Sequence, residues 1–450
     1  MGYTNVIRRI SNKITFIILS IIIVALIIDI SLIKISRFIT VSQSFLGLEI
    51  PILIVIVIVY AIGQYIVLMF VKSKIMETRT IEQLHLNLIH KLVSIVQYVL
   101  ISLLVFLILQ MMVTSGYTVS ILTVIIGISY TQATITLAFL AHRFFSWFKS
   151  NRNFVVMTYG LAIAIISINT GFTLVYVGDV LTTQSDYLRA NSSHTNAFFS
   201  SNSLLSIGYI TSSILSFILT WFATVLILLH YSKKLGRVKY WIIMSIPLAY
   251  FLGQFQPLFL DLFATYRLSE PALFGIVYTL IFTASKPAGG VLFGIAFWSV
   301  ARSIRRSVVR DYMIISAFGF MLLFTSNQAI VLVNFPYPPF GIVTISFMGL
   351  SSYLILIGVY SSAISVSHDI KLRQYIRKSV EQQSTLLDKI GTSEMEQKIQ
   401  KNVIKITRNM SDQIAEQTGI QTSLEEQDIK EYLNKAIKEV KSNREEGSKR

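Results

Sequence analysis

The stretch AHRFFSWFKSNRNFVVMTYGLAIAIISINTGFTLVYV, residues 141–177, decides the fold. Its first part is polar and carries three basic residues, Arg143, Lys149 and Arg152, and its second part, Phe154–Val177, is an apolar run without a charge. A helix needs about 20 apolar residues to cross a hydrocarbon core of about 30 Å, and this run is long enough. The pattern therefore predicts a transmembrane helix whose basic flank lies in the cytoplasm.

The same alternation of polar segments and apolar runs continues through the first 366 residues. It predicts ten membrane spans, over Ile14–Ile33, Ile50–Val71, Leu92–Val113, Val119–Ala141, Phe154–Val177, Leu204–Tyr231, Tyr240–Leu260, Ala272–Val300, Tyr312–Val333 and Ile342–Val366. With a cytoplasmic N-terminus, 18 of the 23 Lys and Arg residues in this part lie in cytoplasmic segments and four in external ones. The opposite orientation would reverse that distribution, against the positive-inside rule. We therefore predict an all-α, polytopic helix bundle of the cell membrane, residues 1–366, with both termini cytoplasmic.

Composition supports a membrane protein. The chain is 53% hydrophobic and only 14% charged, with a mean hydropathy of +0.64. The net charge of +16 comes largely from basic residues that flank the spans, which indicates topology and anionic lipid rather than a nucleic-acid partner. The chain has no cysteine, so disulfides and thiolate metal sites are excluded, and we expect no cofactor. All four tryptophans lie toward the cytoplasmic side of the predicted spans, which predicts an interfacial aromatic belt.

Residues 367–450 form a polar tail. Apolar residues recur at three- to five-residue steps between residues 380 and 406, and again between residues 429 and 440. Ser423 and Glu426 fit a capping box at the start of the second stripe. The pattern predicts two amphipathic, coiled-coil-like helices in the cytoplasm. The tail is too short for a kinase or cyclase domain, which usually exceeds about 100–150 residues.

Two connecting segments carry weaker signals. Met76–His90 interleaves apolar and polar residues, which predicts a short helix lying on the membrane surface. The longest external segment, residues 178–203, contains the sequon Asn191-Ser192-Ser193, so Asn191 is a candidate for glycosylation.

Lys286 is the sharpest candidate for a functional residue. It lies in the middle of the apolar run Ala272–Val300 and is followed by Pro287, Gly289 and Gly290. An ionisable residue inside a span usually faces a wet cavity or a partner, and broken helices at membrane depth form many solute sites. The alternative is that Lys286 donates to the carbonyls that the proline leaves free, and so stiffens a kink.

Other polar residues extend the candidate site. Asp29, the acidic residue well inside a span, is the natural counter-ion for Lys286, although it could instead be hydrated near the outer interface. Gln132, Gln254 and Asn327 lie from mid-depth outward, which predicts a polar cavity open to the outside. Hydrogen bonding between helices is the alternative for these three amides, because it is common in bundles of this size.

Three functional classes compete. The first is a non-enzymatic, receptor-like or complex-assembly subunit that binds a cytoplasmic protein, or a second copy, through residues 380–440. The alternative is a secondary transporter of a small, possibly anionic, solute with its site around Lys286. The third span, which corresponds to the eighth in a 5+5 division, contains neither Pro nor Gly, and this favours the first class. A lipid-modifying enzyme ranks last, because no cluster of His, Asp and Glu faces either interface.

Overall fold

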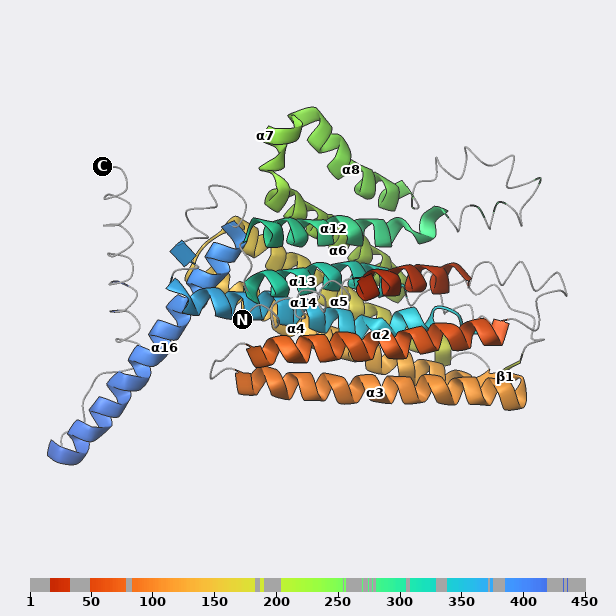
Figure 1. The fold of residues 1–450 in the computed structure, drawn as a ribbon, viewed down its shortest axis with the longest axis horizontal. Helices are drawn as coiled ribbons and strands as arrows, with labels where there is room; N and C mark the ends of the chain where they lie inside the picture. The colour runs from red at the N-terminus through yellow and green to blue at the C-terminus, as the bar shows by residue number, and fades with distance from the viewer. Residues whose placement is uncertain are drawn as a thin grey trace, which may run out of the picture.

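The computed structural model describes residues 17–32, 49–77, 83–182, 187–189, 204–253, 281–304, 308–328, 338–370 and 385–418, and the single positions 255, 269, 274, 277, 373, 374, 432 and 435. Over this part of the chain, long α-helices lie side by side as a bundle, and one helix, α16, extends away from one end (Figure 1). The predicted all-α polytopic bundle is confirmed.

Eight helices in the described part are long and apolar enough to cross a membrane, and each falls on a predicted span. They are α2 (Glu49–Glu77), α3 (Gln83–Thr114), α4 (Val119–Ser150), α5 (Phe154–Thr182), α6 (Leu204–Leu228), α12 (Ser285–Ser303), α13 (Val308–Ser326) and α14 (Ile342–His368). The other two predicted spans coincide with shorter helices, Ile17–Leu32 and α8 (Arg237–Gly253). A short helix, α7 (Tyr231–Leu235), precedes α8, and Gly236 joins the two at φ 84°, a backbone conformation that favours glycine.

A small antiparallel ribbon lies at the end of the bundle remote from α16 (Figure 1). Its strands are β1 (Gly116–Thr118) and β2 (Tyr187–Arg189), with Tyr117 opposite Leu188. The ribbon ties the α3–α4 connection to the segment after α5.

Helix α14 forms the centre of the bundle. Its apolar window is entirely buried, and it packs most closely against α13 and α4 and then against α16. The close approach to α13 depends on Gly358, because a Cβ there would lie 2.1 Å from Ser316 Oγ and 2.5 Å from the Tyr312 carbonyl oxygen. Small residues at such crossings allow helix backbones to pack together without lipid between them.

The predicted surface helix at Met76–His90 is wrong over its second half, because residues 83–90 continue α3. Leu86 and His90 are buried against the bundle, and His90 Nδ1 lies 2.8 Å from the Tyr353 hydroxyl. An unbroken helix also leaves fewer backbone groups without partners than two separate helices would.

Helix α16 (Thr385–Thr418) is the longest described part of the predicted cytoplasmic tail. Its first part is buried against α14 and α4, with Leu387 and Ile390 in the interface. Gly391 allows the contact, since a Cβ there would lie 2.3 Å from Val366 Cγ1. The rest of α16 is largely exposed and leaves the bundle (Figure 1). The second predicted tail helix and its capping box lie outside the described residues, apart from the helical positions Tyr432 and Lys435.

Candidate functional site

Lys286 lies in the first turn of α12, directly after a turn at Ala284. At about 1.5 Å per residue, about 25 Å of helix separates it from Ser303 at the other end of α12. It therefore lies in the half of the bundle remote from α16 (Figure 1). Pro287 is tolerated beside it because the first helical turn does not need its missing N–H.

The Lys286 ammonium group binds the end of a neighbouring helix. Nζ donates to the backbone carbonyl of Asn327, at 3.1 Å, and Asn327 follows the last residue of α13. Among the described residues, Lys286 Nζ has no hydrogen bond to a carbonyl before Pro287, so the alternative in which it stiffens a kink there is wrong. A cation is favoured at a helix C-terminus, where carbonyl groups and the helix dipole concentrate negative potential.

A hydrogen-bonded network surrounds this contact, and we call it the lysine cluster. Its members come from four helices and from the residue that follows α13, and they are Lys286, Asn327, Asn169, Tyr130, Tyr209 and Ser212. Asn327 Nδ2 donates to Asn169 Oδ1 at 3.0 Å, and the Tyr130 hydroxyl donates to Asn327 Oδ1 at 3.3 Å. Asn169 Nδ2 in turn donates to Ser212 Oγ at 3.0 Å. Lys286 is half-buried, whereas Asn169 is fully buried, so the lysine forms the open edge of the cluster.

The two glycines after Lys286 have a packing role. A Cβ on Gly289 would lie 2.3 Å from the Phe217 ring of α6, and one on Gly290 would lie 2.9 Å from Phe324 Cβ of α13. They let α12 approach both helices closely, which holds Lys286 beside the end of α13.

Asp29 has a different partner from the one predicted. Its carboxylate accepts hydrogen bonds from the backbone N–H groups of Gly341 (2.9 Å) and Thr344 (3.0 Å) and from Thr344 Oγ1 (2.8 Å). It thereby caps the first turn of α14, where free N–H groups and the helix dipole favour a negative charge. Asp29 and Lys286 form no ion pair with each other, and Asp29 is fully buried, so hydration alone is also wrong.

Gln132 belongs to a separate set of contacts. Its Oε1 accepts from Gln97 Nε2 at 3.0 Å, and Gln97 Oε1 accepts from the Tyr60 hydroxyl at 3.5 Å. Tyr130, two residues before Gln132, reaches the lysine cluster, and positions two apart on a helix face different sides. The remaining predicted site residues, Gln254 and Asn191, lie outside the described residues.

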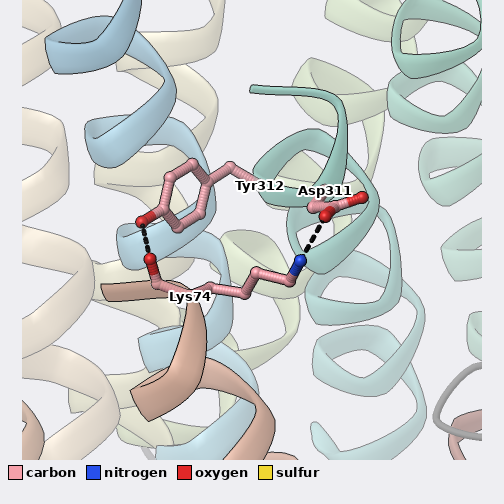
Figure 2. A network of polar contacts seen from close by, with 3 residues as sticks. All are labelled: Lys74, Asp311 and Tyr312. Carbon is pink, nitrogen blue, oxygen red and sulfur yellow. Dashed lines mark hydrogen bonds and ion pairs between the residues drawn. The ribbon is translucent and has the colours of Figure 1, made fainter. Parts of the chain in front are cut away.

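A buried ion pair fastens α2 to α13 at the end of the bundle near α16. Lys74 Nζ lies 2.5 Å from Asp311 Oδ2, and the Tyr312 hydroxyl donates to the Lys74 carbonyl at 2.9 Å, as Figure 2 shows. The Lys74 side chain is only 3% exposed. Because the Lys74 ammonium group is buried, the Asp311 carboxylate offsets the free-energy cost of removing its charge from water.

A second polar group, which we call the tail clamp, holds α16 on the bundle. It consists of Trp147, Ser146 and Ser150 of α4 and Glu394, Glu396 and Gln397 of α16. Trp147 Nε1 donates to Glu394 Oε2 at 2.7 Å, and Ser150 Oγ donates to Glu396 Oε2 at 3.0 Å. Trp147 is fully buried, so the predicted aromatic belt is wrong for this residue, although Trp241 and Trp298 are exposed.

Sequence reasoning missed Tyr209, Ser212 and the partners of Trp147. Serine and tyrosine are common in apolar spans, so no local pattern marks these positions. Among the described residues, no group of three or more His, Asp and Glu side chains could hold a metal ion. Comparison with protein-family models, curated proteins and solved structures finds no match.

Proposed function

We propose that this chain is a multi-pass cell-membrane protein of the receptor-like or complex-assembly kind, without catalytic activity, which binds a cytoplasmic partner through α16. The observation that carries the proposal is a row of exposed apolar side chains on the part of α16 that extends from the bundle. The row consists of Ile399 (44% exposed), Ile406 (54%), Met410 (58%) and Ile414 (48%). Spacings of seven and four residues bring these side chains to one face of the helix. Such a face is typical of helices that bind a groove or another helix.

The attachment of α16 supports a signalling or assembly role. The tail clamp fixes the first part of α16 to α4. The rest of the helix therefore extends from the bundle in a defined direction. Helix α14 then connects α16 with the remote end of the bundle, where Asp29 caps its first turn. A central helix buried along its whole length is suited to carry a displacement from one end to the other.

The orientation is part of the proposal. Lys72, Lys74, Arg143 and Lys149 lie near the end of the bundle from which α16 extends, and this concentration favours a cytoplasmic location for that end. The exposed row would then face the cytoplasm, where a soluble partner can reach it.

A matched pair of variants tests the partner. Ile406→Asp/Met410→Asp places two charges in the exposed row, whereas Lys401→Asp/Arg408→Asp places two on the opposite face of the same helix. We expect wild-type protein, purified gently from membranes of the organism that encodes it, to have a mass above the 50.9 kDa of one chain. The row variant should fall to the single-chain mass by light scattering, and the control should not. A wild-type protein with the mass of one chain would overturn the proposal.

The transporter alternative has one observation in its favour. Lys286 joins the start of α12 to the end of α13, and paired helix ends at membrane depth are frequent at transport sites. The two functions can be distinguished in proteoliposomes that contain the pure protein, with labelled benzoate, a small organic anion, as the probe. Benzoate flux that Lys286→Gln abolishes would establish transport, whereas binding without flux would support the receptor-like function.

A further inference from the structure

The charge of Lys286 is only partly compensated. An ammonium group has three N–H donors, and among the described residues Lys286 Nζ has a single hydrogen bond, to the Asn327 carbonyl. No carboxylate of the described residues lies within ion-pair distance of it, in contrast to Lys74, which binds Asp311 at 2.5 Å. A cation inside a span normally has an anionic partner or faces water. Lys286 thus presents unused donors at the open edge of the lysine cluster.

The neighbouring surface is neutral and aromatic. Lys286 Nζ lies 5.8 Å from the centre of the Tyr209 ring, and Tyr176 stacks on Tyr209 with ring centres 5.9 Å apart at 14°. The amides of Asn327 and Asn169 are engaged with each other and carry no charge. The cluster therefore places one positive charge beside the stacked rings of Tyr209 and Tyr176, with no second cation among its members.

We propose that the lysine cluster binds a small organic monoanion, whose carboxylate pairs with Lys286 and whose apolar body lies against Tyr209 and Tyr176. One ammonium group neutralises one charge, so a monocarboxylate fits and a phosphate dianion would leave a second charge buried. The start of α12, which contains Lys286, lies at the end of the bundle remote from α16 (Figure 1), so the proposed ligand would enter from the side of the membrane opposite the tail. This monoanion would be the ligand of the proposed receptor-like function, and its biological meaning rests on that function. The experiment below measures only the properties of the lysine cluster.

A single introduced cysteine reports on the site, because the chain has none of its own. Ala284→Cys lies two residues before Lys286 at a half-buried position. Its rate of modification is compared for the anionic 2-sulfonatoethyl and the cationic 2-trimethylammonioethyl methanethiosulfonates. Val113→Cys, 83% exposed at the same end of the bundle, is the matched control. We expect the anionic-to-cationic rate ratio to be about tenfold higher at position 284 than at position 113, since a local cation concentrates anions.

Variants of Lys286 make the comparison decisive. Lys286→Gln should bring the ratio at position 284 down to the control value, and Lys286→Arg should preserve it. Ala288→Cys, also half-buried and one turn further along α12, repeats the measurement if Ala284→Cys does not fold. A ratio that does not depend on Lys286, or no modification at either position while Val113→Cys reacts, would overturn the site.

Protection identifies the ligand class. Sodium benzoate should slow modification of Ala284→Cys several-fold when Lys286 is present and leave the rate unchanged with Lys286→Gln. The neutral benzamide and inorganic phosphate should not protect. Protection by phosphate alone, or by no anion, would overturn the carboxylate assignment. The light-scattering test of α16 does not depend on Lys286. A negative result in the protection test can therefore be distinguished from a failure of the proposed function.

Discussion

Three charged side chains inside this bundle, Lys74, Asp29 and Lys286, are each held by a group of opposite polarity, but the groups are of different kinds. Lys74 has the carboxylate of Asp311, Asp29 has the N–H groups that begin α14, and Lys286 has a carbonyl beyond the end of α13. The first pair neutralises charge fully, whereas helix ends supply only partial charges. Lys286 has the weakest compensation of the three, which is why we propose it as the ligand-binding residue, whereas the contacts of Lys74 and Asp29 join helices or cap them.

Asp29 is predicted to act independently of Lys286. Asp29→Ala leaves the Gly341 and Thr344 N–H groups without a partner, and we expect a loss of about 2–3 kcal/mol of stability. Asp29→Asn keeps one acceptor oxygen and should cost less. Because Asp29 and Lys286 do not touch, the effects of Asp29→Asn and Lys286→Met should add within about 0.5 kcal/mol in the double mutant. Unfolding midpoints in detergent measure these losses. A double mutant that loses less stability than the two single mutants together would indicate that Asp29 and Lys286 form an ion pair.

The Lys74–Asp311 pair is predicted to show the opposite behaviour. Asp311→Asn leaves a buried ammonium group without its carboxylate, which typically costs about 3–5 kcal/mol. Replacing both residues, as Lys74→Met/Asp311→Asn, removes the buried charge and should restore part of that loss. The same unfolding assay serves here. If the double variant is less stable than Asp311→Asn alone, the pair does not stabilise the α2–α13 contact in this way.

At the scale of helices, close crossings depend on individual glycines. Gly358 lets α14 approach α13, Gly290 lets α12 approach α13, and Gly391 lets α16 approach the end of α14. These contacts form one packed series from α12 to the tail. Gly127 of α4 differs from them, because nothing lies within 4 Å of the position that its Cβ would occupy.

This contrast gives a matched pair of substitutions. Gly358→Ala would place a methyl group 2.5 Å from the Tyr312 carbonyl and 2.7 Å from the Ser316 N–H nitrogen, and backbone atoms cannot move aside cheaply. We expect a loss of more than about 3 kcal/mol, or failure to fold. Gly127→Ala adds the same methyl group in open space and should be neutral or stabilising by up to about 1 kcal/mol. Equal midpoints for the two variants would contradict the close crossing of α13 and α14.

At the scale of the whole molecule, the sequence predicted where the helices lie but not what they touch. Length and hydropathy are local properties, so the spans of α2 to α6 and α12 to α14 could be located from composition. The partner of Asp29 lies more than 300 residues away, and no local pattern encodes such a contact. Proline and glycine were expected to break the helix around Lys286, but residues 285–290 are helical and form the start of α12, and the contact of Lys286 with Asn327 depends on how α12 and α13 pack.

Orientation follows from the distribution of charge and is predicted for the whole chain. In intact cells, a membrane-impermeant maleimide should modify Val113→Cys and Leu204→Cys, which are 83% and 86% exposed at the end remote from α16. Met410→Cys, on the exposed row of α16, should react only after the membrane is permeabilised. The chain has no native cysteine, so the unmodified protein is the blank for all three variants. Modification of Met410→Cys in intact cells would place the tail outside, and the exposed row could then bind no cytoplasmic partner.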